Sequence, residues 1–263
     1  MFVVACAGMG SAAGRTLGGG VSYQLGDYSF TQAYPDTTYE FSATAPALRY
    51  ALDLTSGPWR VSEFLTTKDA SEGQCDDDWD LATGDEEDYG RVTSFGGDVA
   101  YLFDLGSFRL GPPVGYRDTV IAAGFKYPAE GRFAGWGYGI QASGMRLGAE
   151  VSTSFAGRFS VSGSIGYSPS LAVFEIYKDL YNHVEGGEYE RYVDSWQVLD
   201  PDKSSSYDVS IDASARLTDT IEIVGGYRYE SAGIGIDPTI SYWGASGYTM
   251  KASLFHLGAR CSF

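Results

Sequence analysis

The sequence predicts an all-β protein, specifically a ten-stranded antiparallel up-and-down transmembrane β-barrel. Three observations support this prediction. Apolar and polar residues alternate with a period of two along much of the 263-residue chain, short and long connections alternate strictly, and 35 glycines with 15% aromatic residues favour strands joined by tight corners. No run of eighteen or more apolar residues occurs, so a transmembrane helix is excluded and strands would have to cross the membrane.

The alternation is clearest in the segments 159–167, 207–216 and 221–230. In each segment one face is apolar, and the other carries serine, aspartate, glutamate or arginine. In a membrane barrel the apolar face contacts lipid and the polar face lines the lumen. The side chains expected to face lipid are Phe159, Val161, Ile165, Tyr207, Val209, Ile211, Ile223 and Tyr227.

The connections predict the number and direction of the strands. Four minimal connections lie at 53–58, 104–107, 154–157 and 217–220, and five others lie around 34–38, 71–90, 125–137, 177–203 and 233–246. Most of the second set are long and polar. Nine connections imply ten strands, with tight turns on the periplasmic rim and long loops outside.

Local features refine this arrangement. Pro112 and Pro113 fall inside the fifth strand, where each removes a backbone donor, so we expect a bulge there. His256 is expected on the lumen side of the last strand as a hydrogen-bonded filler. Residues 1–14, MFVVACAGMGSAAG, are interpreted as the remnant of a signal peptide, leaving 15–263 as a single barrel domain. The three cysteines suggest neither a disulfide framework nor a metal knuckle.

The charge of the chain limits its partners. Thirty-four acidic residues against 18 basic ones give a formal net charge of −16, which repels a nucleic-acid backbone and favours a basic peptide or a cation. Eight carboxylates occur in GQCDDDWDLATGDEEDYG, residues 73–90, without a Lys or Arg. This segment and the one containing His183 are both predicted on the outer rim. Their side chains could converge there as an acid, a base and a water.

These residues resemble the omptins, a family of ten-stranded outer-membrane endopeptidases. Asp76, Asp77, Asp78, Trp79 and Asp80 match the Asp-x-Asp-Trp motif of the omptin second loop, and FRLGPPVGYRDT and SSYDVSIDASARLTDTIEIVGGYRYES are similar to omptin strands. The last segment, LFHLGARCSF, resembles the terminal assembly signal of bacterial outer-membrane proteins. The resemblance covers roughly residues 40–263 and implies an outer-membrane location with the active rim facing outside.

The resemblance also implies a set of site residues. Asp76 and Asp78 would hold a water against His183, with no cofactor or metal and with a requirement for lipopolysaccharide. Tyr181 stands where the family has the aspartate that orients the histidine, so Asp179, Glu175 or Glu185 would have to replace it. Asp77, Asp80 and Glu185 are candidates for binding the basic side chains of a substrate peptide or protein.

Other interpretations stay open. An acidic rim loop can be merely solvated, Ca²⁺ binding by the Asp76 segment is disfavoured by Leu81 at the position that requires glycine, and acidic neighbours disfavour Cys75 as a nucleophile. The alternative function is a non-catalytic barrel that acts as a surface adhesin or binds cations or basic ligands. A diffusion channel is the weakest hypothesis, because Arg216, Arg228 and Glu222 would fill a ten-stranded lumen.

Overall fold

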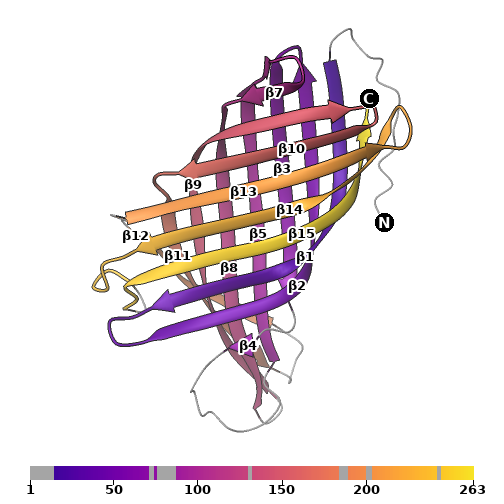
Figure 1. Ribbon diagram of the computed structural model, residues 1–263. Coiled ribbons are helices and arrows are strands. Elements are labelled where there is room, and N and C mark those ends of the chain that lie inside the picture. Colours follow the sequence, from indigo (N-terminus) through magenta and orange to yellow (C-terminus); the bar gives the residue numbers. More distant parts are fainter. Residues whose placement is uncertain are drawn as a thin grey trace.

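In the computed structural model, residues 15–70, 74–75, 87–129, 132–183, 189–199, 203–241 and 244–263 are described, and they form one antiparallel sheet closed into a barrel (Figure 1). Residues 1–14, the predicted signal-peptide remnant, lie outside the described residues. Within the described part of the chain, no helix is long and apolar enough to cross a membrane.

The predicted ten-stranded barrel is confirmed. Six barrel strands are single elements: β1 (Arg15–Ala33), β2 (Thr38–Ser56), β3 (Trp59–Ala70), β9 (Arg132–Phe155), β14 (Ile221–Gly235) and β15 (Gly247–Ser262). Four consist of two elements each: β5 (Glu87–Tyr101) with β6 (Phe103–Asp104), β7 (Phe108–Gly111) with β8 (Pro113–Ala129), β10 (Phe159–Ser168) with β11 (Ala172–His183), and β12 (Tyr189–Leu199) with β13 (Lys203–Arg216). The short β4 (Gln74–Cys75) pairs with β2.

The first and last strands close the barrel. β1 pairs with β15 from Gly18↔Ser262 to Ala33↔Gly247, and every other barrel strand pairs with its neighbours in sequence. β9 is long enough to pair with β10 near one end and with β11 near the other. In the half of the barrel that carries the tight turns, each strand pairs with both of its neighbours, as a bilayer requires, whereas β12 in the other half pairs with β11.

The connections follow the predicted alternation, but several are shorter than expected. The tight turns lie at one end of the barrel, and in the first of them Gly57 has a φ of +59°, which favours glycine. At the other end, the loop expected over 125–137 is largely strand, since β8 runs to Ala129 and β9 begins at Arg132. The region 177–203 is likewise mostly strand. These predictions were wrong because polar strands standing in water lack the alternation that identifies a lipid-facing strand.

The predicted bulge at Pro112 and Pro113 is also wrong. Ala100↔Pro113 and Phe103↔Leu110 share one register, so no extra residue is inserted. The ladder is interrupted at Pro112, which separates β7 from β8. A proline lacks its own N–H, so it removes a hydrogen bond without forcing the chain out of register.

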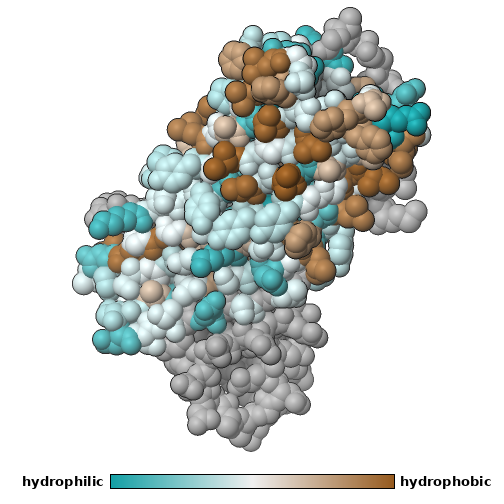
Figure 2. Space-filling model, viewed as in Figure 1, coloured by the Kyte–Doolittle hydropathy of each residue, from teal (hydrophilic) through white to brown (hydrophobic). Residues whose placement is uncertain are grey.

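The outer surface carries an apolar band near the end with the tight turns (Figure 2). Seven of the eight side chains predicted to face lipid are exposed, and the eighth, Tyr227, is half-buried against Phe255 on the same face. The rings of Trp59, Tyr101 and Phe103 lie in a row near the tight turns, edge-to-face or tilted with centroids 5.1 and 4.9 Å apart, like the aromatic girdle of a membrane barrel.

The strands continue well beyond this band. A membrane-crossing strand needs only about 9–11 residues, whereas β1 has 19 residues and β9 has 24. On β1 the outward side chains change from apolar, ending at Leu25, to polar at Asp27, Ser29 and Thr31. The half of the barrel that carries the long connections is therefore a water-exposed extension.

A charge placed in the apolar band tests this assignment. Ile211→Arg should lower the free energy of unfolding in lipid vesicles by about 2–4 kcal/mol, because Ile211 is 55% exposed on the lipid face. Thr31→Arg, on the outward face of the extension, is the matched control and should change it by less than about 0.5 kcal/mol. Equal losses in urea titrations of the two variants would contradict the position of the band.

Candidate functional site

The candidate site lies at the rim of the extension. The strand order places the ends of β3 and β11 and the starts of β5 and β12 at the same end of the barrel. The described residues that flank the acidic segment and the segment after His183 therefore lie at one rim. The predicted site residues Asp76, Asp77, Asp78, Asp80 and Glu185 themselves lie outside the described residues.

The chain that leads to Asp76 is attached to the barrel wall. Gln74 and Cys75 form β4, which pairs with Ser42 and Phe41 of β2. In the ring, β2 and β11 are five strands apart and therefore on opposite sides. A site that uses residues after Cys75 together with His183 would consequently span the mouth of the barrel.

His183 is the last residue of β11, and Asp179 and Tyr181 precede it on the same strand. The pairing of β11 with β9 is unbroken from Ala172↔Ser143 to His183↔Arg132. In such a strand each residue advances about 3.3 Å, which separates the Cα atoms of Asp179 and His183 by about 13 Å. Asp179 could therefore orient His183 only if β11 departed from this geometry.

Glu175 is farther still from His183, about 26 Å along the strand, and it has other partners. It is 3% exposed inside the barrel and accepts hydrogen bonds from the hydroxyls of Tyr248 and, at 2.7 Å, Ser241. Burial, the hydrogen bond to Glu175 and the charge of Glu175 together raise the pKa of Tyr248 well above its usual value. Glu175 therefore holds the connection after β14 against β11.

This connection, of which residues 236–241 and 244–246 are described, forms part of the floor of the mouth. Ala245 and Ile236 are buried, and the backbone N–H and hydroxyl of Thr239 donate to Asp237, which holds the pKa of that exposed carboxyl below its usual value. Ile236 and Ala245 pack into the apolar cluster of the lumen, and Ile240 lies against it.

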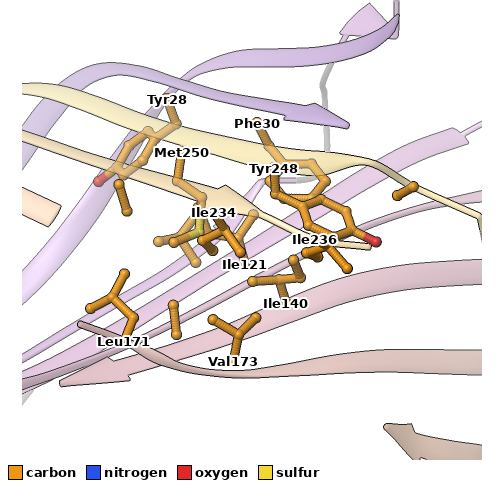
Figure 3. Packing of buried hydrophobic residues seen from close by; sticks show 14 of the residues in the cluster. Tyr28, Phe30, Ile121, Ile140, Leu171, Val173, Ile234, Ile236, Tyr248 and Met250 are labelled. Carbon is orange, nitrogen blue, oxygen red and sulfur yellow. The ribbon is translucent and has the colours of Figure 1, made fainter. Parts of the chain in front are cut away.

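An apolar cluster fills the lumen beneath this floor (Figure 3). Ile140 and Val173 are fully buried, and Phe30 stacks on Tyr248 with ring centroids 5.6 Å apart. The cluster comprises Tyr28, Phe30, Val92, Ile121, Ile140, Ala142, Leu171, Val173, Ala232, Ile234, Ile236, Ala245, Tyr248, Met250 and Leu254. The prediction of a polar lumen is therefore wrong for the extension, where water wets the outer wall and apolar side chains turn inward.

Within the apolar band the lumen is polar and is crossed by ion pairs. Arg146, 2% exposed, donates to both carboxylate oxygens of Asp208 at 2.6 and 2.7 Å and to Asp98 at 3.3 Å. Asp98 also accepts from Arg117 at 2.6 Å. The network thus joins β5, β8, β9 and β13 across the barrel, and each guanidinium has a carboxylate partner, as buried charge requires.

Glycines make room for this network. A Cβ at Gly166 would lie 2.0 Å from Arg146 Nε and 2.3 Å from Asp208 Oδ2, and one at Gly115 would lie 2.1 Å from Asp98 Oδ1. No heavier side chain fits at either position without displacing the ion pairs. Some of the glycine content of the chain therefore serves the lumen and not the turns.

Other arginines also fill the polar part of the lumen. Arg49, Arg117 and Arg228 lie around the ring of Phe64, with guanidinium carbons 3.8, 4.8 and 5.3 Å from its centroid, a favourable cation–π arrangement. His256 Nε2 lies 3.0 Å from Asp212 Oδ1, which confirms the prediction of a hydrogen-bonded filler. Arg60 pairs with Glu150 on the same side of the network as the tight turns.

The remaining cavities are small or lie away from the rim. A cavity of about 280 Å³ occupies the polar lumen around Arg49, Asp98 and Arg260, and one of about 70 Å³ separates the arginines from the apolar cluster. The described side chains thus interrupt the lumen at two levels, and the hypothesis of a diffusion channel loses its basis. In the described part of the chain, no group of three or more His, Cys, Asp or Glu residues could hold a metal ion.

The sequence did not predict the interior partners. Asp98, Arg146 and Asp208 are charged residues at the inward-facing positions of alternating strands. This pattern predicts that they lie in the lumen, but it does not predict which of them pair. Glu175 and Tyr248 are 73 residues apart, and nothing local connects them. The glycine facing each charged group was the missed clue, because it marks a close approach within the strand.

The comparisons with known proteins reveal a similar fold. No protein-family model and no curated protein matches the sequence. Among solved structures, the chain is similar to the outer membrane protease OmpT from Escherichia coli, with a TM-score of 0.65, 14% identity, and coverage of 97% of this chain and 99% of that chain. The toluene transporter TodX from Pseudomonas putida (TM-score 0.42, 7% identity, 96% and 90% coverage) and a major outer membrane protein from Thermus thermophilus (0.40, 13%, 92% and 99%) are less similar. At this identity the likeness to OmpT shows the fold alone.

Substituting one of the glycines that face the ion pairs tests the ion network. Gly166→Ala should lower the free energy of unfolding by at least about 1–3 kcal/mol, because the new Cβ overlaps Arg146 and Asp208. Gly163→Ala on the same strand is the control, since its Cβ would meet its nearest atom at an ordinary 3.5 Å. Urea unfolding in vesicles measures both, and a Gly166→Ala variant as stable as Gly163→Ala would contradict the described packing.

Proposed function

We propose that this protein is an omptin-like outer-membrane endopeptidase that cleaves peptides at basic residues. The proposal is carried by one observation. The barrel topology brings the flanks of the acidic segment and His183 to one rim, on opposite sides of the mouth, above a lumen that is filled with protein. A substrate reaching this rim would lie across the mouth and could not pass through the barrel.

The chemistry follows from the residue types. His183 accepts a proton from a water held against Asp76 and Asp78, and the water oxygen adds to the peptide carbonyl carbon. The proton then passes to the leaving amine as the peptide bond breaks. Two neighbouring aspartates raise each other's proton affinity, which suits a pair that shares one proton. No acyl-enzyme forms in this scheme.

The acidic rim supports the proposed choice of substrate. Asp77, Asp80 and Glu185 would attract arginine or lysine side chains beside the cleaved bond, and the net charge of −16 steers basic peptides towards the protein. The proposed location is the bacterial outer membrane with this rim outside. Its proposed partners are membrane lipid, lipopolysaccharide, which the resemblance implies as a requirement, and a basic peptide or protein.

Tyr181 favours a second candidate function. A histidine without an acidic neighbour loses control of its tautomer, and the rim would then bind basic ligands without cleaving them. In that case the protein would be a surface adhesin or a receptor for cationic peptides. Cleavage and binding measurements separate the two candidates.

The test uses the folded protein in detergent with added lipopolysaccharide and a fluorogenic peptide containing Arg-Arg. We expect cleavage between about pH 5 and 8, the range over which histidine titrates, and Asp76→Ala, Asp78→Ala or His183→Ala should each remove most of it. Asp36→Ala, which deletes an exposed acid in the connection after β1 on the same rim, is the matched control and should retain full activity. Saturable binding of the peptide without cleavage at any pH would reject the protease and support the second candidate.

A further inference from the structure

The proposed site has no acid at position 181, two residues before His183. A histidine that acts as a base needs a hydrogen-bond acceptor for its second ring N–H, to hold one tautomer and to stabilise the imidazolium. Tyr181 is two residues before His183, and a phenol does not supply a negative charge near neutral pH. The backbone pairing of β11 shows which residues stand close enough to do so.

β9 provides no acid at the paired positions nearest His183. Along this edge of β11, Tyr181 stands opposite Ala134, and His183 stands opposite Arg132. An arginine opposite the histidine would disfavour the imidazolium. The orienting group must therefore come from elsewhere.

The other neighbour of β11 provides a carboxylate. Along β12, Tyr181 stands opposite Glu190, and Asn182 stands opposite Tyr189. Directly opposite residues of an antiparallel pair share a face, and residues diagonal by two positions lie about 7–8 Å apart, within reach of long side chains. Glu190 is diagonal to His183, whereas Asp179 is about 13 Å away along its own strand.

A bulge creates this register. Tyr177 pairs with Ser195, but Asp179 pairs with Tyr192, so β12 contains one residue more than β11 in this interval. If the register of Tyr177 continued unbroken, Arg191 would stand opposite Tyr181, and Glu190 would fall on the other face. Bulges next to active sites commonly redirect a side chain in this way. Here the extra residue exchanges a cation for a carboxylate at the position beside His183.

We propose that Glu190, on the paired strand β12, is the positioning residue for His183. It takes the role of the acid that position 181, a tyrosine, does not provide. This inference rests on the proposed function, since it assigns a role within the same site. Among the described residues, the charged ones at positions next to His183 are then Glu190 on β12, Arg132 on β9 and Asp179 on β11. Of these, Glu190 is the acid diagonal to His183 on the neighbouring strand, and a carboxylate at that position favours the imidazolium.

Kinetics provide the first test. Glu190→Gln should lower kcat on the Arg-Arg peptide by on the order of 10²-fold or more, with KM nearly unchanged, because the glutamine keeps the shape but not the charge. Adding Tyr181→Asp to Glu190→Gln should restore at least about tenfold of that loss, since an acid two residues before His183 can take over the role. Glu40→Gln, the same substitution at an exposed position of β2, is the control and should behave as the unmodified protein.

Titration of His183 provides a second test that does not need activity. The chain contains only two histidines, so NMR can follow His183 after His256 is assigned by substitution. A nearby carboxylate favours the protonated ring, so Glu190→Gln should move the titration midpoint of His183, and the acid limb of the activity profile, to lower pH. Circular dichroism and heat-modifiable gel mobility check that each variant folds.

The outcomes separate the two levels of the proposal. An unchanged His183 midpoint in Glu190→Gln overturns the role of Glu190, whether or not any peptide is cleaved. A loss of activity in Asp179→Asn deeper than in Glu190→Gln also overturns it. A shifted midpoint in a protein that cleaves nothing supports the geometry around His183 and rejects the protease.

Discussion

Closure of the backbone ladder is the constraint on which the rest of this structure depends. In hydrocarbon an unpaired N–H or C=O costs several kcal/mol, so a sheet can cross a bilayer only if its first and last strands meet. The sixteen consecutive pairs between β1 and β15 meet this requirement. Once the ring is closed, the remaining freedom concerns which side chains face outward, which fill the lumen, and how far the strands continue.

The apolar side chains change from outward to inward positions at the edge of the apolar band that lies farther from the tight turns. On β1 the outward positions are apolar up to Leu25, whereas beyond it the inward positions Tyr28 and Phe30 are apolar and the outward ones are polar. β14 shows the same exchange, with Ile221 and Ile223 outward in the band and Ile234 inward beyond it. Lipid and water thus act as two solvents along one strand. The extension behaves as a small water-soluble barrel with its own core, continuous with a membrane barrel that has a charged interior.

This exchange explains what could be predicted from the sequence. Segments inside the band, such as 159–167 and 207–216, alternate cleanly, so their strands, their faces and the tight turns between them were predictable. In strands that cross the edge of the band, the apolar side chains change from the outward to the inward positions midway. The period-two pattern of such a strand therefore partly cancels. The predictions of loops at 125–137 and 177–203 were wrong for this reason. Pairing across the lumen, as between Arg146 and Asp208, depends on the tilt and stagger of the strands, which residue spacing does not encode.

The position of the strands that flank the candidate site was predictable, but their register was not. The alternation of connections was enough to assign the strand ends on either side of the acidic segment, and His183, to one rim. The register near His183 was not readable, because a single extra residue in β12 decides whether Glu190 or Arg191 stands opposite Tyr181. No periodic pattern reveals a one-residue bulge in a polar strand.

The length of the strands also gives the molecule a fixed reach. Among the described side chains of β9, the exposed apolar ones begin at Met145, and 13 residues of the strand lie beyond it towards Arg132. At about 3.3 Å per residue and a tilt of about 40°, these carry the rim roughly 30 Å above the hydrocarbon. Any chain that contacts the mouth must therefore do so well above the lipid headgroups. The height of the barrel wall therefore limits the partners of the rim to those that project far enough from their own surface to reach it, in addition to the limit set by charge.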